Sequence, residues 1–264
     1  MALARILVAG LACLAPASAL AGAWTFEEGR GQVSWNALVS SAHRAFDANG
    51  RRASIPRYLK AEDQLLLEYG VTDWLTAIIG PGLQYVEIAA PVNARRTGFG
   101  MSEFGARLRL WQSDGWVVST QVLARVPGTS QAGNPAALGY TDAEYDLRAL
   151  VGKNFTLANM PAFIDVQIAQ RFRAGAPPDE FRADFTLGVE VAPRWMVLAQ
   201  AFNVVSQGAG QAPFNASYDY SKAQLSVVHA VTPAWSVQAG AFTTYRGRNA
   251  LVENGLVFGV WYKF

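Results

Sequence analysis

The sequence has almost no cysteine and almost no histidine. Its 264 residues include 1 Cys and 2 His. Cys13 lies in the first 23 residues, so a chain that loses this segment has no thiol. That excludes disulfides, thiol catalysis and thiolate metal sites from the mature chain. His43 and His229 are too few and too far apart in the chain to indicate a metal centre, and we expect no cofactor.

Charge of one sign and long apolar runs are also missing. The 22 Lys and Arg nearly balance the 20 Asp and Glu, and the chain has no basic tail, so a nucleic-acid partner is not expected. A hydrophobic content of 51% with 12% aromatics is too high for a disordered chain. Beyond residue 23 no run of about 18 uncharged apolar residues occurs, so the sequence offers no candidate spanning helix. If the mature chain enters a membrane, it does so as strands.

Residues 1–23 have the pattern of a cleaved export signal. Arg5 supplies the charge, residues 6–15 form a short apolar core, and residues 16–21 are mostly small. Cleavage after Ala19, Ala21 or Ala23 fits this pattern equally well. We therefore expect a signal peptide over 1–23, and a single domain over 24–264 in a protein that leaves the cytoplasm.

Most of the remaining chain alternates between apolar and polar residues with period two. Between Glu180 and Val191, Phe and aliphatic residues share one face and mainly polar residues share the other. The same alternation predicts twelve strands, near 31–46, 57–70, 74–87, 99–111, 115–126, 141–153, 161–172, 180–191, 195–206, 217–230, 235–246 and 251–264. Many are longer than the roughly 9–11 residues that a tilted strand needs to cross a bilayer.

The connections between these strands alternate in length. Short turns occur near 71–73, 112–115, 192–194 and 231–234, whereas longer polar or Gly/Pro-rich loops occur at 47–56, 88–98, 127–140, 173–179 and 207–216. Short periplasmic turns and long outer loops are typical of outer-membrane barrels. The turn at 154–160 is longer than the others of its set. Trp74, Trp116, Trp195 and Trp235 follow the short turns, which indicates an aromatic girdle at that edge.

The end of the chain resembles the final strand of Gram-negative outer-membrane β-barrels. Phe258, Val260, Tyr262 and Phe264 alternate along it, and the chain stops on an aromatic residue. In that family such a strand is an assembly signal, so the resemblance implies insertion by the barrel-assembly machinery and closure of the last strand onto the first. The phrase from Tyr69 to Thr76 is also similar to periplasmic turns of small transporter and channel barrels. The expected fold is all-β: a closed antiparallel transmembrane barrel of about 12 strands with meander topology.

Closure has a physical reason, because unpaired backbone groups are costly in hydrocarbon and only a closed sheet has no edge. The polar face of each strand then lines the lumen, since a mid-bilayer Arg or Lys on the lipid side costs about 2–4 kcal/mol. The candidate lumen or substrate-path residues are Glu103, Arg107, Arg109, Arg125, Glu144, Asp146, Arg148, Arg182 and Asp184. Arg107, Arg109 and Arg125 form a basic patch beside an acidic one, which fits either a pore constriction or an ion-pair network that braces a narrow barrel.

We therefore expect a monomeric, porin-like channel or transporter in the outer membrane that passes small polar or anionic solutes through a charged lumen. Its expected partners are outer-membrane lipids, lipopolysaccharide and the assembly machinery. The pairs Arg51–Arg52 and Arg95–Arg96 are candidate contacts to lipopolysaccharide phosphates, and solvated loop charge is the simpler interpretation of them. One alternative is a barrel without an open pore that serves polysaccharide export, a surface structure or biofilm. A lipid-modifying enzyme is the other alternative, but His43 beside Ser40 and Ser41 lacks a Gly-x-Ser-x-Gly motif, so no enzymatic activity is expected.

Overall fold

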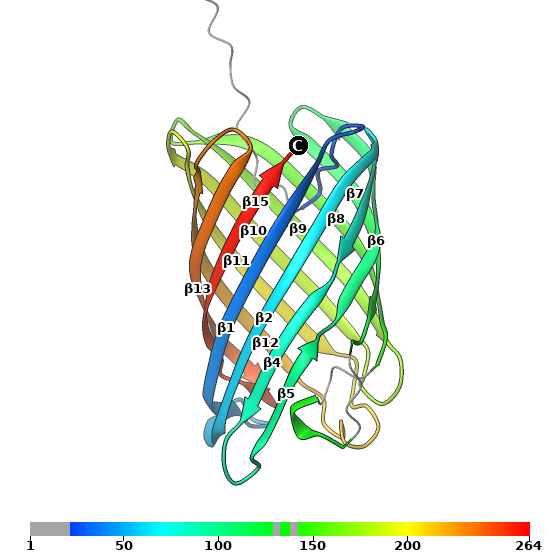
Figure 1. Cartoon of the computed structure of the whole chain (residues 1–264), viewed down its shortest axis with the longest axis vertical. Helices are drawn as coiled ribbons and strands as arrows, with labels where there is room; N and C mark the ends of the chain where they lie inside the picture. Colours follow the sequence, from blue (N-terminus) through cyan, green and yellow to red (C-terminus); the bar gives the residue numbers. More distant parts are fainter. Residues whose placement is uncertain (1–21, 129–132, 138–141) are drawn as a thin grey trace, which may run out of the picture.

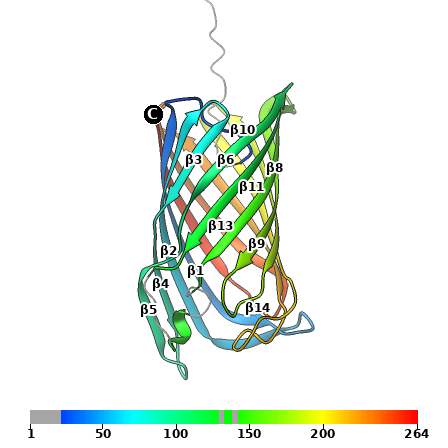
Figure 2. The same cartoon turned by 90° about the vertical axis from the view of Figure 1, so that its right-hand side faces the viewer.

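The chain forms a closed antiparallel β-barrel of twelve strands, seen from two sides in Figures 1 and 2. The computed structural model describes residues 22–128, 133–137 and 142–264. The strand segments in these residues are β1 (Gly31–Phe46), β2 (Arg52–Thr72), β3 (Leu75–Gly80), β4 (Gly82–Ile88), β5 (Ala94–Phe99), β6 (Ser102–Ser113), β7 (Trp116–Val126), β8 (Glu144–Leu157), β9 (Met160–Arg173), β10 (Glu180–Ala192), β11 (Trp195–Ser206), β12 (Asp219–Ala230), β13 (Trp235–Arg248), β14 (Ala250–Leu251) and β15 (Asn254–Lys263). A short 3-10 helix, η1, covers Pro135–Ala137.

The fifteen segments make twelve wall strands because three pairs are interrupted strands. β3 and β4 are separated only by Pro81, which cannot donate a ladder hydrogen bond. β5 and β6 are separated at 100–101, and β14 and β15 at 252–253. Neighbours in sequence pair as a meander, and β1 closes the wall by pairing with β2 on one side and with β14 and β15 on the other. No backbone edge is left where the barrel closes, as the sequence predicted.

The alternation of side chains gives the barrel its two faces. Large apolar residues such as Leu65, Phe104 and Phe185 are exposed on the outside, whereas Glu68, Arg107 and Asp146 are buried inside. The four predicted girdle tryptophans are all exposed, and each lies beside a tight turn at the end of the barrel that carries the C-terminus. That end therefore has the aromatic belt expected at a membrane surface.

Three connections differ from the sequence prediction. β2 begins at Arg52, which pairs with Phe46, so the loop predicted at 47–56 is shorter than expected. The turn predicted over 154–160 is tight, because β8 continues to Leu157, which pairs with Met160. Ala158 and Asn159 both have positive φ, 48° and 65°, as a two-residue hairpin of the primed type requires. About half of the loop predicted over 88–98 is also strand, since β5 pairs with β4 and the two form a hairpin that reaches the lowest point of the barrel in Figure 2. Within the described ranges, no helix is long and apolar enough to span a membrane.

Candidate functional site

The lumen at the C-terminal end of the barrel contains the segment that precedes β1. The main chain enters at the rim, where the amide of Gly29 donates to the carbonyl of Gly70 at 2.9 Å. The Phe26 amide then donates to Oγ1 of Thr76 on β3 at 2.9 Å, and Nη1 of Arg107 on β6 donates to the Trp24 carbonyl at 2.9 Å. Residues 22–29, here called the lumen segment, thus cross the inner wall from strand to strand.

Apolar packing completes this attachment. Trp24 packs edge-to-face on Phe163 with ring centroids 5.7 Å apart, and it also contacts the cluster of Ala23, Val117 and Leu150. β8 has Gly152 at the point where the indole lies, and a Cβ there would be 2.5 Å from the ring. The sequence analysis missed this segment because residues 22–30 have no periodicity; two aromatics close before the first strand are its only trace.

The outer half of the lumen is filled on one side by a continuous network of ion pairs. Its cations are Arg125, Arg148, Arg171, Arg173 and Arg182, and its anions are Glu103, Glu144, Asp146, Glu180 and Asp184. Five positive charges against five negative charges give no net charge. We call this set the arginine network. Such buried pairs persist only when each charge keeps its partner and hydrogen bonds.

The arginine network continues into the outer loops through Tyr218. The Tyr218 hydroxyl donates to Oε1 of Glu180 at 2.6 Å and accepts from Nη1 of Arg173 at 3.0 Å. Burial raises the pKa of the Tyr218 hydroxyl, and the neighbouring Glu180 carboxylate raises that pKa further. The hydroxyl therefore stays protonated and remains a donor at neutral pH.

Among the described residues, two smaller groups of buried or half-buried ion pairs lie in the lumen beside this network. Nη2 of Arg107 pairs with Oε1 of Glu68 at 2.9 Å, and both side chains are buried. Lys60 and Lys222 share Glu253, and Lys60 also pairs with Glu62 at 3.0 Å. Each of these groups is also balanced in charge.

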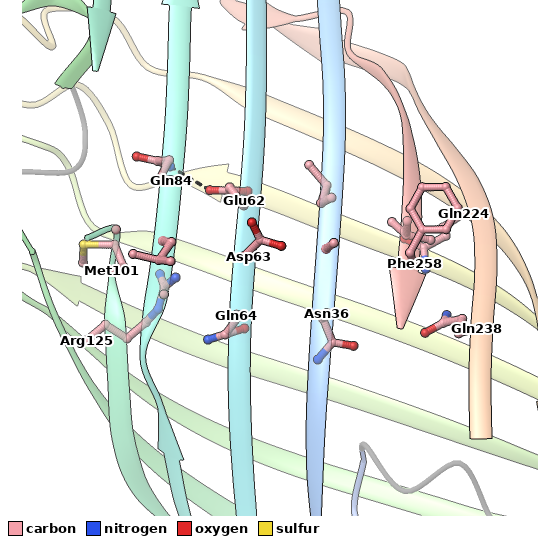
Figure 3. A pocket seen from close by; sticks show the side chains of 16 residues that line it. Asn36, Glu62, Asp63, Gln64, Gln84, Met101, Arg125, Gln224, Gln238 and Phe258 are labelled. Carbon is pink, nitrogen blue, oxygen red and sulfur yellow. Dashed lines mark hydrogen bonds between the residues drawn. The ribbon is translucent and has the colours of Figure 1, made fainter. Parts of the chain in front are cut away.

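Three adjoining cavities lie in the lumen between the described residues. A cavity of about 510 Å³ near the outer loops borders Arg125 and Met101. The same two residues border a middle cavity of about 310 Å³, shown in Figure 3. An inner cavity of about 200 Å³ shares Asn36, Gln224 and Gln238 with the middle one. We call this succession the lumen track.

Side-chain amides dominate the middle of the lumen track. Asn36 and Gln64 lie opposite each other on β1 and β2, Gln238 lies on β13 beyond β15, and Nε2 of Gln84 donates to Oε1 of Glu62 at 2.8 Å (Figure 3). The inner cavity ends at Phe163, which packs on Trp24 of the lumen segment. The lumen track therefore leads from an outer cavity lined by charged side chains, through a middle cavity rich in side-chain amides, to the lumen segment.

The three arginines that the sequence predicts as one basic patch lie at different places in the structure. Arg107 holds the lumen segment, and Arg109 donates to Oε1 of Gln112 near the turn that follows β6. Arg125 alone borders the outer and middle cavities, where it pairs with Glu103 and Glu144. Arg148 and Arg182 are bound to carboxylates of the arginine network, with Arg148 between Asp146 and Asp184.

The histidines and the final strand occupy other places. His43 is exposed at a bulge of β1, and His229 stacks on Trp195 with centroids 4.2 Å apart at the opposite end of the barrel. The described residues contain no cluster of three or more His, Cys, Asp or Glu that could hold a metal ion. On β15, Phe258, Val260 and Tyr262 pair with Ala37, Trp35 and Val33 of β1. Phe258, Tyr262 and Phe264 are exposed on the outer face.

Comparison with protein families gives a match over residues 51–260. The matching family is described as "Putative MetA-pathway of phenol degradation". No curated protein matched the chain.

Solved structures with the same fold are outer-membrane barrels. An outer membrane channel from Pseudomonas putida F1 is similar with a TM-score of 0.76 and 15% sequence identity, over 92% of this chain and 98% of that chain. The KdgM porin has a TM-score of 0.54 and 8% identity, over 88% of this chain and 99% of that chain. The NanC porin has a TM-score of 0.53 and 12% identity, over 86% and 100%. The fold is therefore that of porin-like barrels, and the protein is located in the cell outer membrane.

Proposed function

Since the chain belongs to the family described as "Putative MetA-pathway of phenol degradation", we propose that it is a channel. From the lumen geometry we propose that its solutes are small neutral molecules with a polar group, such as phenols. The observation that carries the proposal is the lumen track, a row of cavities between the outer loops and the lumen segment. The phenol in the family description supports this solute class, although it names a pathway and not a ligand of this chain.

The charge balance of the lumen favours neutral solutes over anions. Arg125 is the arginine that borders the middle cavity, and its guanidinium already contacts two carboxylates. An entering anion would have to compete with these carboxylates, and separating a partly buried ion pair is costly. The amides of Gln64 and Gln238 can instead donate to or accept from a hydroxyl without losing a charge partner.

The positions of the histidine and serine side chains also support a transport function and not a catalytic one. The two histidines lie at opposite ends of the barrel, and Ser40 donates its hydroxyl to Oε1 of Glu253 instead of facing a histidine. A serine nucleophile needs a base within hydrogen-bond reach. We propose that the protein has no enzymatic activity.

Planar-bilayer recording tests the proposal. We expect small current steps, a reversal potential near zero in a salt gradient, and brief interruptions of the current when phenol is added. Gln64→Leu and Gln238→Leu together should shorten the interruptions, because they remove two amides from the middle cavity. Gln207→Leu is the matched control, since Gln207 is exposed in an outer loop. Strong anion selectivity without phenol interruptions would contradict the neutral-solute proposal.

A further inference from the structure

Asp165 on β9 is a carboxylate without a positive partner in the described parts of the chain. It is 1% exposed. Oδ1 accepts from Nε2 of Gln167 at 2.5 Å, and Oδ2 accepts from the amide of Ala23 at 2.7 Å. No lysine or arginine among these residues forms an ion pair with it, although the lumen ion-pair groups described above are balanced. Buried carboxylates are rarely left without a cation.

The nearest cations are already engaged. Arg107 pairs with Glu68 and Arg148 pairs with Asp146 and Asp184, so both reach Asp165 only as neighbouring charges. Gln167 stands between Arg148 and Asp165, because its Oε1 accepts from Arg148 while its Nε2 donates to Asp165. Oδ2 therefore faces the start of the lumen segment, and none of the described lysines and arginines forms an ion pair with it.

Gly22 occupies that side. It is buried, and a Cβ at this residue would lie 2.6 Å from Oδ2 and 2.8 Å from Cγ of Asp165. With standard bond lengths, the Cα of Gly22 is then within roughly 4 Å of the carboxylate oxygen, and its nitrogen within roughly 5 Å. A side chain at position 22 would collide with the carboxylate, so the position accepts glycine alone without movement.

We propose that export processing cleaves the chain between Ala21 and Gly22, and that the new α-ammonium of Gly22 pairs with Asp165 to fasten the lumen segment. Ala19 and Ala21 provide the small residues that a signal peptidase requires at the third and first positions before the cut. The enzyme adds water across the Ala21–Gly22 peptide bond. The C–N bond breaks, Ala21 leaves as a carboxylate, and the nitrogen of Gly22 takes up protons to become an ammonium.

The other two cleavage positions fit the structure less well. Cleavage after Ala23 would remove Gly22 and Ala23, and with them the amide bound to Asp165 and the carbonyl that accepts from Ser119. Cleavage after Ala19 would leave two residues before Gly22, so Gly22 would keep an uncharged peptide nitrogen beside the carboxylate. Cleavage after Ala21 supplies the missing positive charge at Asp165. The inference holds whatever solute passes through the barrel.

The first test is the intact mass and N-terminal sequence of the protein extracted from the outer membrane. We expect the sequence Gly-Ala-Trp-Thr, beginning at Gly22. A mature chain that begins at Leu20 or Trp24 would overturn the proposal, and so would an uncleaved chain.

A second measurement tests the ion pair itself in the folded protein. Acetylation of the α-amine near neutral pH, followed by mass spectrometry of the N-terminal peptide, reports how accessible that amine is. Asp165→Asn should speed the labelling by about tenfold or more, as expected when a charge-assisted hydrogen bond is lost. Asp184→Asn is the matched control, because Asp184 pairs with Arg148 in the outer half and forms no hydrogen bond with the described residues of the lumen segment. Equal labelling rates in the wild type and in folded Asp165→Asn would overturn the proposed pair.

Discussion

Replacing Trp24 by alanine should release the lumen segment and raise the conductance of the barrel. Six hydrogen bonds that involve side chains attach residues 23–28 to the wall. At about 1 kcal/mol net each they contribute about 6 kcal/mol. Ordering the eight residues of the segment costs about 8–16 kcal/mol. The hydrogen bonds alone therefore do not keep the segment in the lumen, and its apolar side chains decide the outcome.

The contribution of Trp24 follows from its packing. A tryptophan side chain buries on the order of 150–250 Å², which at about 25 cal/mol per Å² corresponds to about 4–6 kcal/mol for complete burial. Trp24 is only partly buried, so about 3 kcal/mol is a reasonable share, including its edge-to-face contact with Phe163. Losing it should raise the population of the released segment roughly a hundredfold.

Single-channel recording of refolded protein in planar bilayers is the assay. Trp24→Ala also widens the lumen directly, so a second variant is needed to separate the two effects. Gly152→Ala adds volume and places a methyl group 2.5 Å from the indole, which should also displace the segment. Trp35→Ala is the control, because Trp35 lies on the outer face of β1. If Gly152→Ala leaves the conductance unchanged or lowers it, the argument that the segment closes the lumen is refuted.

Three further predictions concern other parts of the barrel. Arg148→Ala should destabilise the fold by about 3–5 kcal/mol, because it leaves Asp146 and Asp184 without their shared cation; thermal unfolding in detergent would show it, and an unchanged midpoint would contradict the bracing role. Gln238→Glu adds a negative charge to the middle cavity, so the reversal potential in a salt gradient should shift toward cation selectivity, and no shift would place ion flow elsewhere. Deletion of Phe264 should lower the amount of protein in the outer membrane if the final aromatic is an assembly signal, whereas refolding in detergent should be little affected; normal levels in cells would contradict that role.

The sequence predicts which residues of each strand face outward and which face inward. It predicts the ends of the strands less accurately. β10 was predicted to end at Val191 and ends at Ala192, because its pattern is regular throughout. The extent of β8 was underestimated, because Ala158 and Asn159 turn the chain with backbone angles that composition alone does not reveal. The sequence predicts a loop in place of β5, because paired arginines and a nearby proline obscure its short alternation.

For the lumen, the sequence predicts which residues face inward but not which of their charges form ion pairs. Periodicity places Asp146 and Arg148 on the inner face, but it does not say which charges meet. In the structure, Asp146 pairs with Arg148 on its own strand and with Arg171 on the next. Partner choice depends on strand register, which a one-residue slip would change for every pair. The role of Arg107 in holding the lumen segment depends on a part of the chain without any pattern.

The path of the lumen segment has a topological consequence. The segment enters over the same rim as the C-terminus, through Gly29, Arg30 and the start of β1. It is not threaded between strands, so its removal from the lumen would break none of the hydrogen bonds between neighbouring wall strands. A force or partner that withdraws the lumen segment therefore has to act from the end of the barrel that carries the C-terminus, inside the cell envelope, and not from the surrounding medium.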